Sequence, residues 1–367
     1  MRVDAIELDF YRNYLHLEAR FSPASNVIYG ENAQGKTNLL EAVAYLSTAS
    51  SHRARYDREL IQFGVDHAFL KAQVQSRDRD FTLEASLHRG ARRQLTSNGV
   101  KLKSAGELSG ILNTVLFCPE DLSLIRDGAA ARRRFLDDAI CQLRPRYAAA
   151  LAEYKKLYEH KTRILRDWPE KPSLLDTLDE FSLRMAQTGA ILIHYRAHFI
   201  RRLMEAAPPI HADFSGGREL LGLKYETVKT IADPEASPRD LLPLLLAHQE
   251  SHRQAELDAR QCLTGPHKDD LVVTLDGVDA KTYASQGQTR TAALSLKLGC
   301  REIFFQETGE WPVLLLDDVL SELDARRQEF VLNRIGGGQV FITCCEDDKL
   351  DGLGDGATFH IHGGKLV

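Results

Sequence analysis

The sequence predicts a mixed α/β fold in which a parallel sheet is interrupted by a mainly helical insertion. Three observations indicate this architecture. A glycine-rich loop, Gly30–Thr37, follows a short apolar run near the start of the chain. A second apolar run, Val313–Leu316, ends in Asp317 in the last quarter. Between about 120 and 206 the apolar residues instead recur with the period of amphipathic helices. The chain therefore leaves its sheet, builds a helical body and returns to complete the sheet.

The first hundred residues are predicted to form mainly strands. Asn98-Gly99 is typical of a two-residue hairpin turn, and one helix beginning at Thr37 interrupts the strands. The alternating or continuous apolar runs that predict these strands are 3–10, 15–21, 25–29, 69–74, 81–87, 93–96 and 100–102.

The middle of the chain is predicted to contain two long antiparallel helices. Trp168-Pro169 and Lys171-Pro172 break the first, and a second stretch, 174–204, contains almost no helix breaker. Pro208-Pro209 and Gly216-Gly217 mark a further boundary. Beyond it, strands are expected at 221–225, 271–275, 313–317 and 339–343, and helices at 238–261, 289–305 and 325–334.

Composition limits the class of protein. The chain has 367 residues, 43% of them hydrophobic, which suffices for a large core divided into two or three domains. No apolar run approaches the roughly 20 residues needed to span a bilayer, and the alternating N-terminus does not resemble a signal peptide. The six cysteines show no metal-ligand spacing, so we expect reduced thiols, a cytoplasmic location and no association with a membrane.

The charge distribution leaves a nucleic-acid partner possible. The net charge of −5 argues against one, but residues 126–166 hold eleven Lys and Arg against five Asp and Glu. Within them, Arg132-Arg133-Arg134 would either contact DNA phosphates or form a solvated face. Arg53, Arg55 and Arg58 could reach either nucleotide or DNA.

The glycine-rich loop has the pattern of a phosphate-binding P-loop, GxxxxGKT, between a predicted strand and a predicted helix. Its glycines allow backbone N–H groups to surround phosphate oxygens, and the helix N-terminus favours negative charge. Lys36 would reach the β and γ phosphates of ATP, and the Thr37 hydroxyl would bind Mg²⁺. The candidate nucleotide-binding residues are Gly30, Glu31, Asn32, Ala33, Gln34, Gly35, Lys36 and Thr37.

Two adjacent carboxylates follow the buried strand 313–316. Asp317 lies at the carboxyl end of a parallel strand, where open α/β sheets bind ligands, and is predicted to hold Mg²⁺ with Thr37. Asp318 would face the γ-phosphate and orient the attacking water. Lys36, Asp317 and Asp318 are therefore the candidate catalytic residues.

A third motif precedes the predicted helix 289–305. The run Ser285, Gln286, Gly287 and Gln288 resembles the signature motif of ABC-type ATPases, and Ser321-Glu322-Leu323-Asp324 resembles the loop after their Walker B strand. In that superfamily the signature serine binds the γ-phosphate held by the P-loop of the opposite subunit. Ser285 and Gly287 could supply hydroxyl and backbone N–H donors at a helix N-terminus, although an ordinary helix cap would have the same residues.

Over nearly its whole length the chain resembles the RecF family of the structural-maintenance and ABC-type ATPase superfamily. The resemblance rests on Gly30–Thr37, Cys118–Leu122, Arg132–Asp137, Gly265–Asp270, Ser285–Arg290 and Asp317–Asp324. It implies an ABC-type P-loop ATPase head formed by 1–117 and 250–367, with a helical lid at 118–249. It also implies an ATP-dependent homodimer, slow DNA-stimulated ATP hydrolysis, and binding to single- and double-stranded DNA. RecR and RecO would be partners in loading RecA at gaps.

The chain departs from the family pattern at several positions. Lys268 replaces the usual Arg, Thr289 a common Gln, and Thr343 stands where ABC transporters have a switch His. Asp318 is shorter than the Glu of transporters, which would slow turnover. His194 and His198 lie one helical turn apart without a carboxylate in a metal-site pattern, so packing is favoured over metal binding.

Three other functions compete with this interpretation. A transporter ATPase subunit would not carry the long helical insertion, and chromosome-organising relatives need coiled-coil arms longer than the roughly 45 Å these helices could span. The third is an ATP-binding scaffold that recruits repair proteins and whose hydrolysis is incidental.

Overall fold

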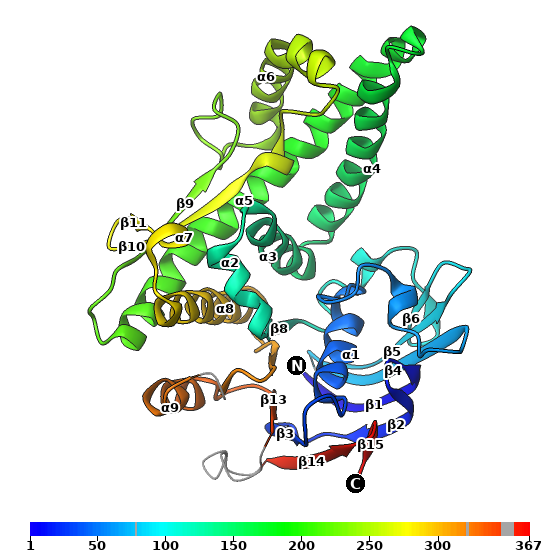
Figure 1. The fold of residues 1–367 in the computed structure, drawn as a ribbon, viewed down its shortest axis with the longest axis vertical. Helices are drawn as coiled ribbons and strands as arrows, with labels where there is room; N and C mark the ends of the chain where they lie inside the picture. Colours follow the sequence, from blue (N-terminus) through cyan, green and yellow to red (C-terminus); the bar gives the residue numbers. More distant parts are fainter. Residues whose placement is uncertain (78, 321–322, 346–355) are drawn as a thin grey trace. The chain divides into compact units, whose positions relative to one another are not determined.

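The computed structural model describes residues 1–77, 79–320, 323–345 and 356–367. Their internal contacts divide the chain into two compact units. The first, here the sheet unit, comprises Met1–Leu122 and Ala293–Val367, and the second, here the helical unit, comprises Ser123–Ala292. Two six-stranded sheets belong to the first unit, and the longest helices belong to the second (Figure 1). The predicted mixed α/β class is confirmed.

One sheet of the sheet unit is antiparallel throughout. Strand β4 buries alternate side chains along its whole length and β5 does so from Leu83 to Leu87, as a period-two pattern predicts. The β6–β7 turn is Asn98-Gly99, and both residues have the positive φ that a type I′ turn needs. The strand order is β2 (Tyr14–Arg20), β1 (Arg2–Tyr11), β4 (His67–Ser76), β5 (Arg79–His88), β6 (Gln94–Ser97) and β7 (Val100–Lys101).

The other sheet is parallel from β14 to β8, and it positions the candidate site. Its order is β15 (Lys365–Leu366), β14 (Ala357–His362), β3 (Ser25–Tyr29), β13 (Val340–Cys344), β12 (Val313–Leu316) and β8 (Thr114–Phe117). The sequence did not predict β8, β14 or β15. Because parallel strands end at a common edge, the segments that follow β3, β12, β13 and β8 begin there together.

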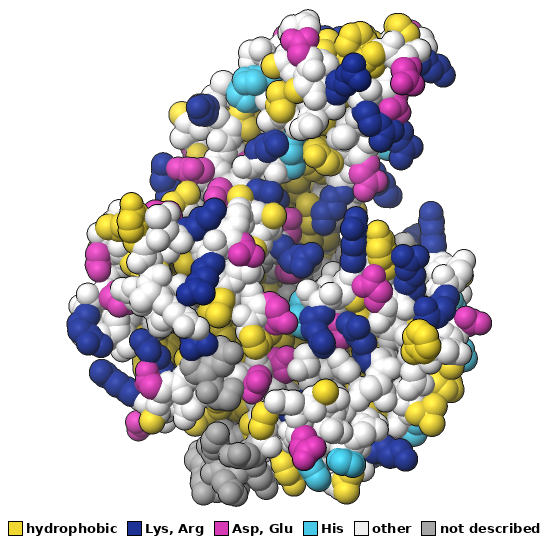
Figure 2. Space-filling model, viewed as in Figure 1, with side chains coloured by type: hydrophobic (Ala, Val, Ile, Leu, Met, Phe, Trp, Pro, Cys, Tyr) yellow, Lys and Arg dark blue, Asp and Glu magenta, His cyan; other side chains and the backbone are white. Residues whose placement is uncertain are grey.

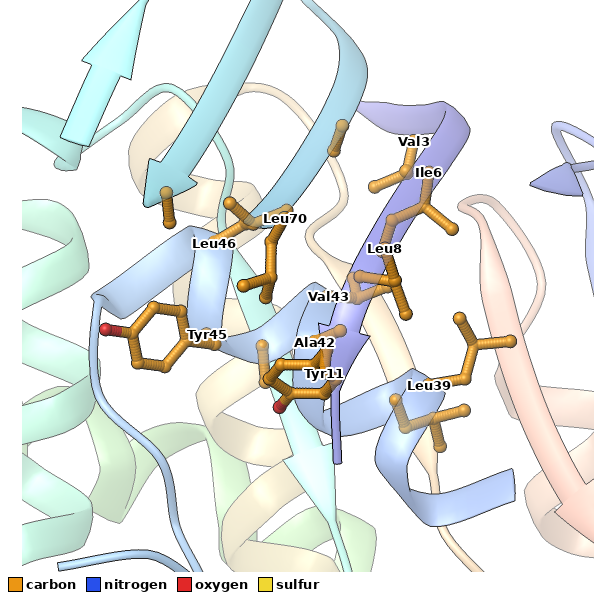
Figure 3. Close-up of a cluster of buried hydrophobic side chains, with 14 of the residues drawn as sticks. Val3, Ile6, Leu8, Tyr11, Leu39, Ala42, Val43, Tyr45, Leu46 and Leu70 are labelled. Atoms are coloured by element: carbon orange, nitrogen blue, oxygen red, sulfur yellow. The ribbon is translucent and has the colours of Figure 1, made fainter. Parts of the chain in front are cut away.

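Helix α1 (Lys36–Thr48) supplies much of the core of the sheet unit. It contacts β4 and β5 of the antiparallel sheet and β8 and β13 of the parallel sheet, so most of its residues are buried. Figure 3 shows its apolar side chains among those of β1 and β4. Each fully buried aliphatic side chain of this kind contributes about 1.5–3 kcal/mol. The P-loop is thereby attached to a helix that is buried between strands of both sheets.

Four long helices form the body of the helical unit: α3 (Ala129–Leu143), α4 (Pro145–Asp167), α5 (Leu178–Ser215) and α6 (Pro238–Ala259). Helix α5 packs against the other three. A small antiparallel sheet, ordered β11 (Val278–Asp279), β10 (Asp270–Leu275) and β9 (Leu221–Glu226), adds to the unit, and β9 contacts α5.

The remaining helices complete the two units. The α-helices are α2 (Ser123–Arg126), α7 (Ala280–Tyr283), α8 (Gln286–Thr308) and α9 (Ala325–Arg334). The 3₁₀-helices are η1 (Asp57–Glu59), η2 (Ala105–Leu108), η3 (Pro119–Leu122), η4 (Pro172–Thr177) and η5 (Pro266–Lys268). Within the described part of the chain, no helix combines the length and apolar character required to cross a lipid bilayer.

The predicted boundary at Pro208-Pro209 is wrong, because α5 continues through both prolines to Ser215. An interior proline removes one backbone hydrogen bond and costs about 3 kcal/mol. Here a buried stripe offsets that cost. The stripe comprises Leu203, Ala207, Ile210 and Phe214. The helix instead ends at Gly216, whose φ of 64° is left-handed.

The contact-based units differ from the predicted division at the second boundary. Residues 250–292 belong to the helical unit by their contacts, and the boundary between the units falls within α8. The predicted lid, 118–249, is a functional division, and it stays a prediction.

Candidate nucleotide site

The P-loop connects β3 to α1 in a conformation that requires its glycines. Gly30 and Gly35 have φ of 147° and 123°, where side chains are strained. A Cβ atom on Gly30 would also overlap the Ile361 carbonyl oxygen. Lys36 lies buried over the loop and donates from Nζ to the carbonyls of Gly30 (2.6 Å) and Glu31 (2.9 Å). The ammonium group of Lys36 therefore lies inside the loop.

Contacts from distant segments fix the outer side of this loop. Asn13 Nδ2 donates to the Gln34 carbonyl (2.7 Å), and Tyr14 Oη donates to the Gly35 carbonyl (2.8 Å). The Gly363 N–H donates to Gln34 Oε1 (2.6 Å), and the Gly364 N–H donates to the Gln34 carbonyl (3.1 Å). The sequence analysis missed Asn13 and the 363–364 turn, because turn residues carry no pattern that pairs them with a loop elsewhere.

Thr37 and Asp317 meet at the edge of the parallel sheet, as the sequence predicts. Thr37 Oγ1 donates to Asp317 Oδ1 (2.9 Å), and Thr343 Oγ1 donates to the same oxygen (2.8 Å). Burial, the largest cause, raises the pKa of Asp317, and the two threonine hydroxyls oppose this shift. Glu120, after β8, raises it further. Glu120 is therefore a nearby carboxylate that the sequence analysis did not select.

This cluster suits a magnesium ion shared with phosphates. Mg²⁺ prefers oxygen ligands and is commonly held by one or two protein groups together with substrate phosphates. Thr37 and Asp317 provide one hydroxyl and one carboxylate in mutual contact. The described residues contain no group of three or more His, Cys, Asp or Glu that could hold a metal ion. At a Mg²⁺ site of this type, substrate phosphates and water supply the remaining ligands.

Asp318 has an unusual backbone conformation. Its φ is 53°, in the left-handed region, which costs a non-glycine residue about 1 kcal/mol or more. Its N–H donates to Thr343 Oγ1 (2.8 Å), so one hydroxyl connects the backbone of Asp318 to the carboxylate of Asp317. Thr343, whose role the sequence left open, therefore fixes both acidic residues.

The signature residues lie at the start of α8 in the helical unit. The Ser285 N–H donates to Gln288 Oε1 (2.8 Å), and the Gln288 N–H donates to Ser285 Oγ (3.3 Å). This reciprocal pair is a capping box, so the helix begins at Gln286, three residues earlier than predicted. Ser285 and Gln286 are exposed, and Gly287 is partly exposed.

The loop after the Walker B strand is only partly described. Ser321 and Glu322 lie outside the described residues, whereas Asp324 caps α9 by accepting from the Arg327 N–H (2.9 Å).

The predicted role of Arg132 in contacting DNA or solvent is wrong. Its guanidinium is buried and donates to Asp270 Oδ1 (2.6 Å) and Oδ2 (2.8 Å). A run of arginines looks the same in the sequence whether its members face water or pair with a carboxylate of the fold. Arg134 remains exposed, and Arg133 donates to the Asp269 carbonyl (2.6 Å).

The three arginines that follow α1 have different surroundings in the structure. Arg53 Nη1 donates to Asn38 Oδ1 (3.0 Å) in the first turn of α1, so Arg53 lies beside the P-loop. Arg55 and Arg58 instead lie over the Tyr56 ring, 5.2 Å and 4.7 Å from its centroid.

Comparisons with known proteins agree with this geometry. The family described as RecF/RecN/SMC N terminal domain matches residues 2–355. Proteins named DNA replication and repair protein RecF from Agathobacter rectalis and Bacillus subtilis are 42% and 38% identical to this chain. The alignments cover 95% and 100% of this chain, and 93% and 100% of the relatives.

Comparison with solved structures also finds similarity to RecF. One described as the recombination mediator protein RecF-ATP in the RecFOR pathway has a TM-score of 0.92 at 33% identity, covering 100% of this chain and 96% of that chain. An Smc head domain derived from Pyrococcus furiosus shares the fold alone, with a TM-score of 0.56 at 16% identity over 100% of this chain and 95% of that chain. The chain therefore belongs to the RecF family of DNA replication and repair proteins.

Proposed function

We propose that this protein is an ATPase whose ATP-dependent dimerisation controls its binding to DNA during recombinational repair. One observation carries the proposal: the P-loop lysine, the Thr37 hydroxyl and the Asp317 carboxylate converge at one edge of the parallel sheet. That arrangement suits a nucleoside triphosphate with Mg²⁺. The match to a structure described as RecF-ATP supports the same ligand.

In the proposed site, the backbone N–H groups of residues 30–37 surround the phosphates, and Lys36 turns its ammonium group from the loop carbonyls to the β and γ phosphates. Thr37 and Asp317 would hold Mg²⁺, which neutralises charge on the phosphate oxygens. Asp318 orients and accepts a proton from the attacking water. Thr343 would hold the Asp317 carboxylate and the Asp318 backbone in place through its single hydroxyl.

Ser285 and Gly287 would complete the site of a second copy of the chain. In the capping box, Ser285 Oγ accepts the Gln288 N–H, so its own hydroxyl hydrogen can still be donated to a phosphate oxygen. A two-fold dimer would then have two identical sites, each formed by the P-loop of one copy and the signature of the other. ATP would favour the dimer because only the dimer uses both sets of donors.

Ser285→Arg is expected to abolish ATP-dependent dimerisation while ATP binding to the monomer stays within about twofold, since its bulk and charge change only the signature side. Analytical ultracentrifugation with Mg²⁺ and a slowly hydrolysed ATP analogue measures dimerisation, and titration with a fluorescent ATP analogue measures binding. Ser251→Arg, an exposed serine on α6, is the matched control. Normal dimers of Ser285→Arg would exclude the shared site.

Asp318→Asn is expected to lower the rate of ATP hydrolysis by about 100-fold or more, the size typical of a lost general base. ATP binding and dimerisation should be retained, because Asp317 and Thr37 are unchanged. Single-turnover hydrolysis measures the effect, with the exposed Asp80→Asn on β5 as control. An unchanged rate would remove Asp318 from the mechanism. Retained repair function in a variant that does not hydrolyse ATP would favour the scaffold alternative.

DNA binding is proposed to depend on phosphate contacts with little sequence preference. On the face drawn in Figure 2, Lys and Arg side chains recur among acidic ones, which suits contact with a phosphate backbone more than base readout. Residues 126–166 supply several exposed cations: Arg134, Arg146, Lys155, Lys156, Arg163 and Arg166. We also propose RecO, RecR and functionally RecA as partners, because a solved relative is described as a recombination mediator in the RecFOR pathway.

A further inference from the structure

Gln288 is held at both ends of its side-chain amide. Its Oε1 accepts the Ser285 N–H (2.8 Å), and its Nε2 donates to Glu219 Oε1 (3.1 Å). An amide has distinct donor and acceptor ends, so the Glu219 carboxylate, which only accepts, determines which way the amide points. With the amide in this orientation, its oxygen faces Ser285 and closes the capping box.

Glu219 is itself fixed by the segment that carries it. Helix α5 ends in a left-handed cap in which the Gly217 N–H donates to the Ala212 carbonyl (2.7 Å), and the Glu219 N–H donates to Ser215 Oγ (3.3 Å). One residue later, the Leu220 N–H donates to Asp276 Oδ1 (2.8 Å). The backbone of Glu219 is thus anchored on both sides.

A buried histidine holds the second oxygen of the same carboxylate. His211 Nε2 lies 3.1 Å from Glu219 Oε2, and His211 has no exposed surface. Burial, the largest cause, lowers the pKa of His211, although Glu219 raises it. Because a carboxylate only accepts, His211 donates to it through Nε2–H, and the carboxylate accepts from α5 on one side and from α8 on the other.

We propose that Glu219 is a positioning residue for the signature motif: through Gln288 it fixes the orientation of Ser285 and the first turn of α8. Glu219 does not touch nucleotide. The inference rests on the proposed role of Ser285 in completing the site of a second copy. It adds a residue 66 positions earlier in the chain, in the connection between α5 and β9, to the determinants of ATP-dependent dimerisation.

The test compares substitutions of similar size that differ in hydrogen bonding. Glu219→Leu removes both acceptors, and we expect it to weaken ATP-dependent dimerisation by about tenfold or more, the value of one hydrogen bond to a charged group. Glu219→Gln retains an oxygen that can accept from Gln288 Nε2, and it should stay within about threefold of the wild type. Analytical ultracentrifugation with Mg²⁺ and a slowly hydrolysed ATP analogue measures the dimer dissociation constant.

Glu235→Leu is the matched control. Glu235 belongs to the same unit, its side chain is 34% exposed compared with 23% for Glu219, and it also contacts a histidine, His198. Binding of a fluorescent ATP analogue to the monomer should be equal in all variants, because the P-loop is unchanged. A purely structural role would not produce rescue by Gln together with unchanged monomer binding.

The remaining outcomes distinguish the role of Glu219 from the proposed site shared between two copies of the chain. If Ser285→Arg dimerises normally, the shared site fails and the role of Glu219 fails with it. If Ser285→Arg does not dimerise but Glu219→Leu behaves like Glu235→Leu, only the role of Glu219 is overturned. Should Glu219→Leu not fold, as judged by circular dichroism, Glu219→Asp keeps the charge but moves it away from Gln288. It must then also weaken the dimer, and an unchanged dimer would contradict the inference.

Discussion

Lys36→Met is expected to weaken ATP binding by about 100-fold or more. The ammonium group of Lys36 already lies inside the P-loop, where it donates to the carbonyls of Gly30 and Glu31. Contacts of this charge with phosphate oxygens are charge-assisted hydrogen bonds worth about 1.5–3 kcal/mol each, and methionine replaces them with an uncharged chain of similar length. Isothermal titration calorimetry with ATP and Mg²⁺ measures the loss.

Lys71→Met is the control for this substitution. It removes one positive charge from the same unit, but Lys71 lies on β4, partly exposed, and its Nζ is 3.4 Å from Glu7 Oε2. ATP affinity in this variant should match the wild type. Equal affinities for Lys36→Met and Lys71→Met would show that Lys36 does not bind phosphate.

Arg196→Leu is expected to destabilise the helical unit by about 3 kcal/mol or more, because it leaves buried carboxylates without their cation. Arg196 is almost wholly buried in α5 and donates to Asp137 Oδ1 (2.8 Å), Asp269 Oδ2 (2.9 Å) and the Pro266 carbonyl (2.7 Å). Burial raises the pKa of Asp269, and Arg196 opposes that shift. Without the arginine, α5 would lose its hydrogen bonds to Pro266 and Asp269. Urea denaturation followed by circular dichroism measures the change in the free energy of unfolding.

Arg201→Leu provides the comparison on the same helix. Its side chain is 55% exposed, and its ion pair with Glu235 (3.3 Å) lies at the surface, where such pairs contribute about 0–1 kcal/mol. The free energy of unfolding should therefore change little. If the two variants unfold at the same urea concentration, the buried network has no stabilising role.

Local patterns predicted most elements of the fold, because burial on one face leaves a period in the sequence. Helix α9 has its predicted bounds, 325–334, and β3 its predicted bounds, 25–29. The path of α5 through Pro208-Pro209 could not be predicted, because the opposing gain comes from packing against other helices rather than from local preference.

In the candidate site, too, local sequence motifs could be predicted, whereas contacts that depend on the tertiary structure could not. The P-loop is a contiguous motif, and the rule that parallel strands end together predicted the meeting of Thr37 with Asp317. The sequence drew attention to Thr343 because it stands where ABC transporters have a switch His. Its hydroxyl connects Asp317 to the backbone of Asp318, and this contact depends on the left-handed backbone of Asp318, which no residue pattern indicates. Glu219 lies in a connection between elements and was not suggested by any motif.

The parallel sheet also determines the order in which the protein can fold during its synthesis. Within the described parts of the chain, strand β3 pairs with β13 and β14 alone, and Gln34 is held by Gly363, 329 positions later. At about 5–20 residues per second, the ribosome takes roughly 15–65 seconds to make that intervening chain. The helical unit is one continuous segment, Ser123–Ala292, and can form its core first. Until β13 has been made, the P-loop strand has none of its sheet neighbours, so a nascent chain would gain its capacity to bind ATP late in translation.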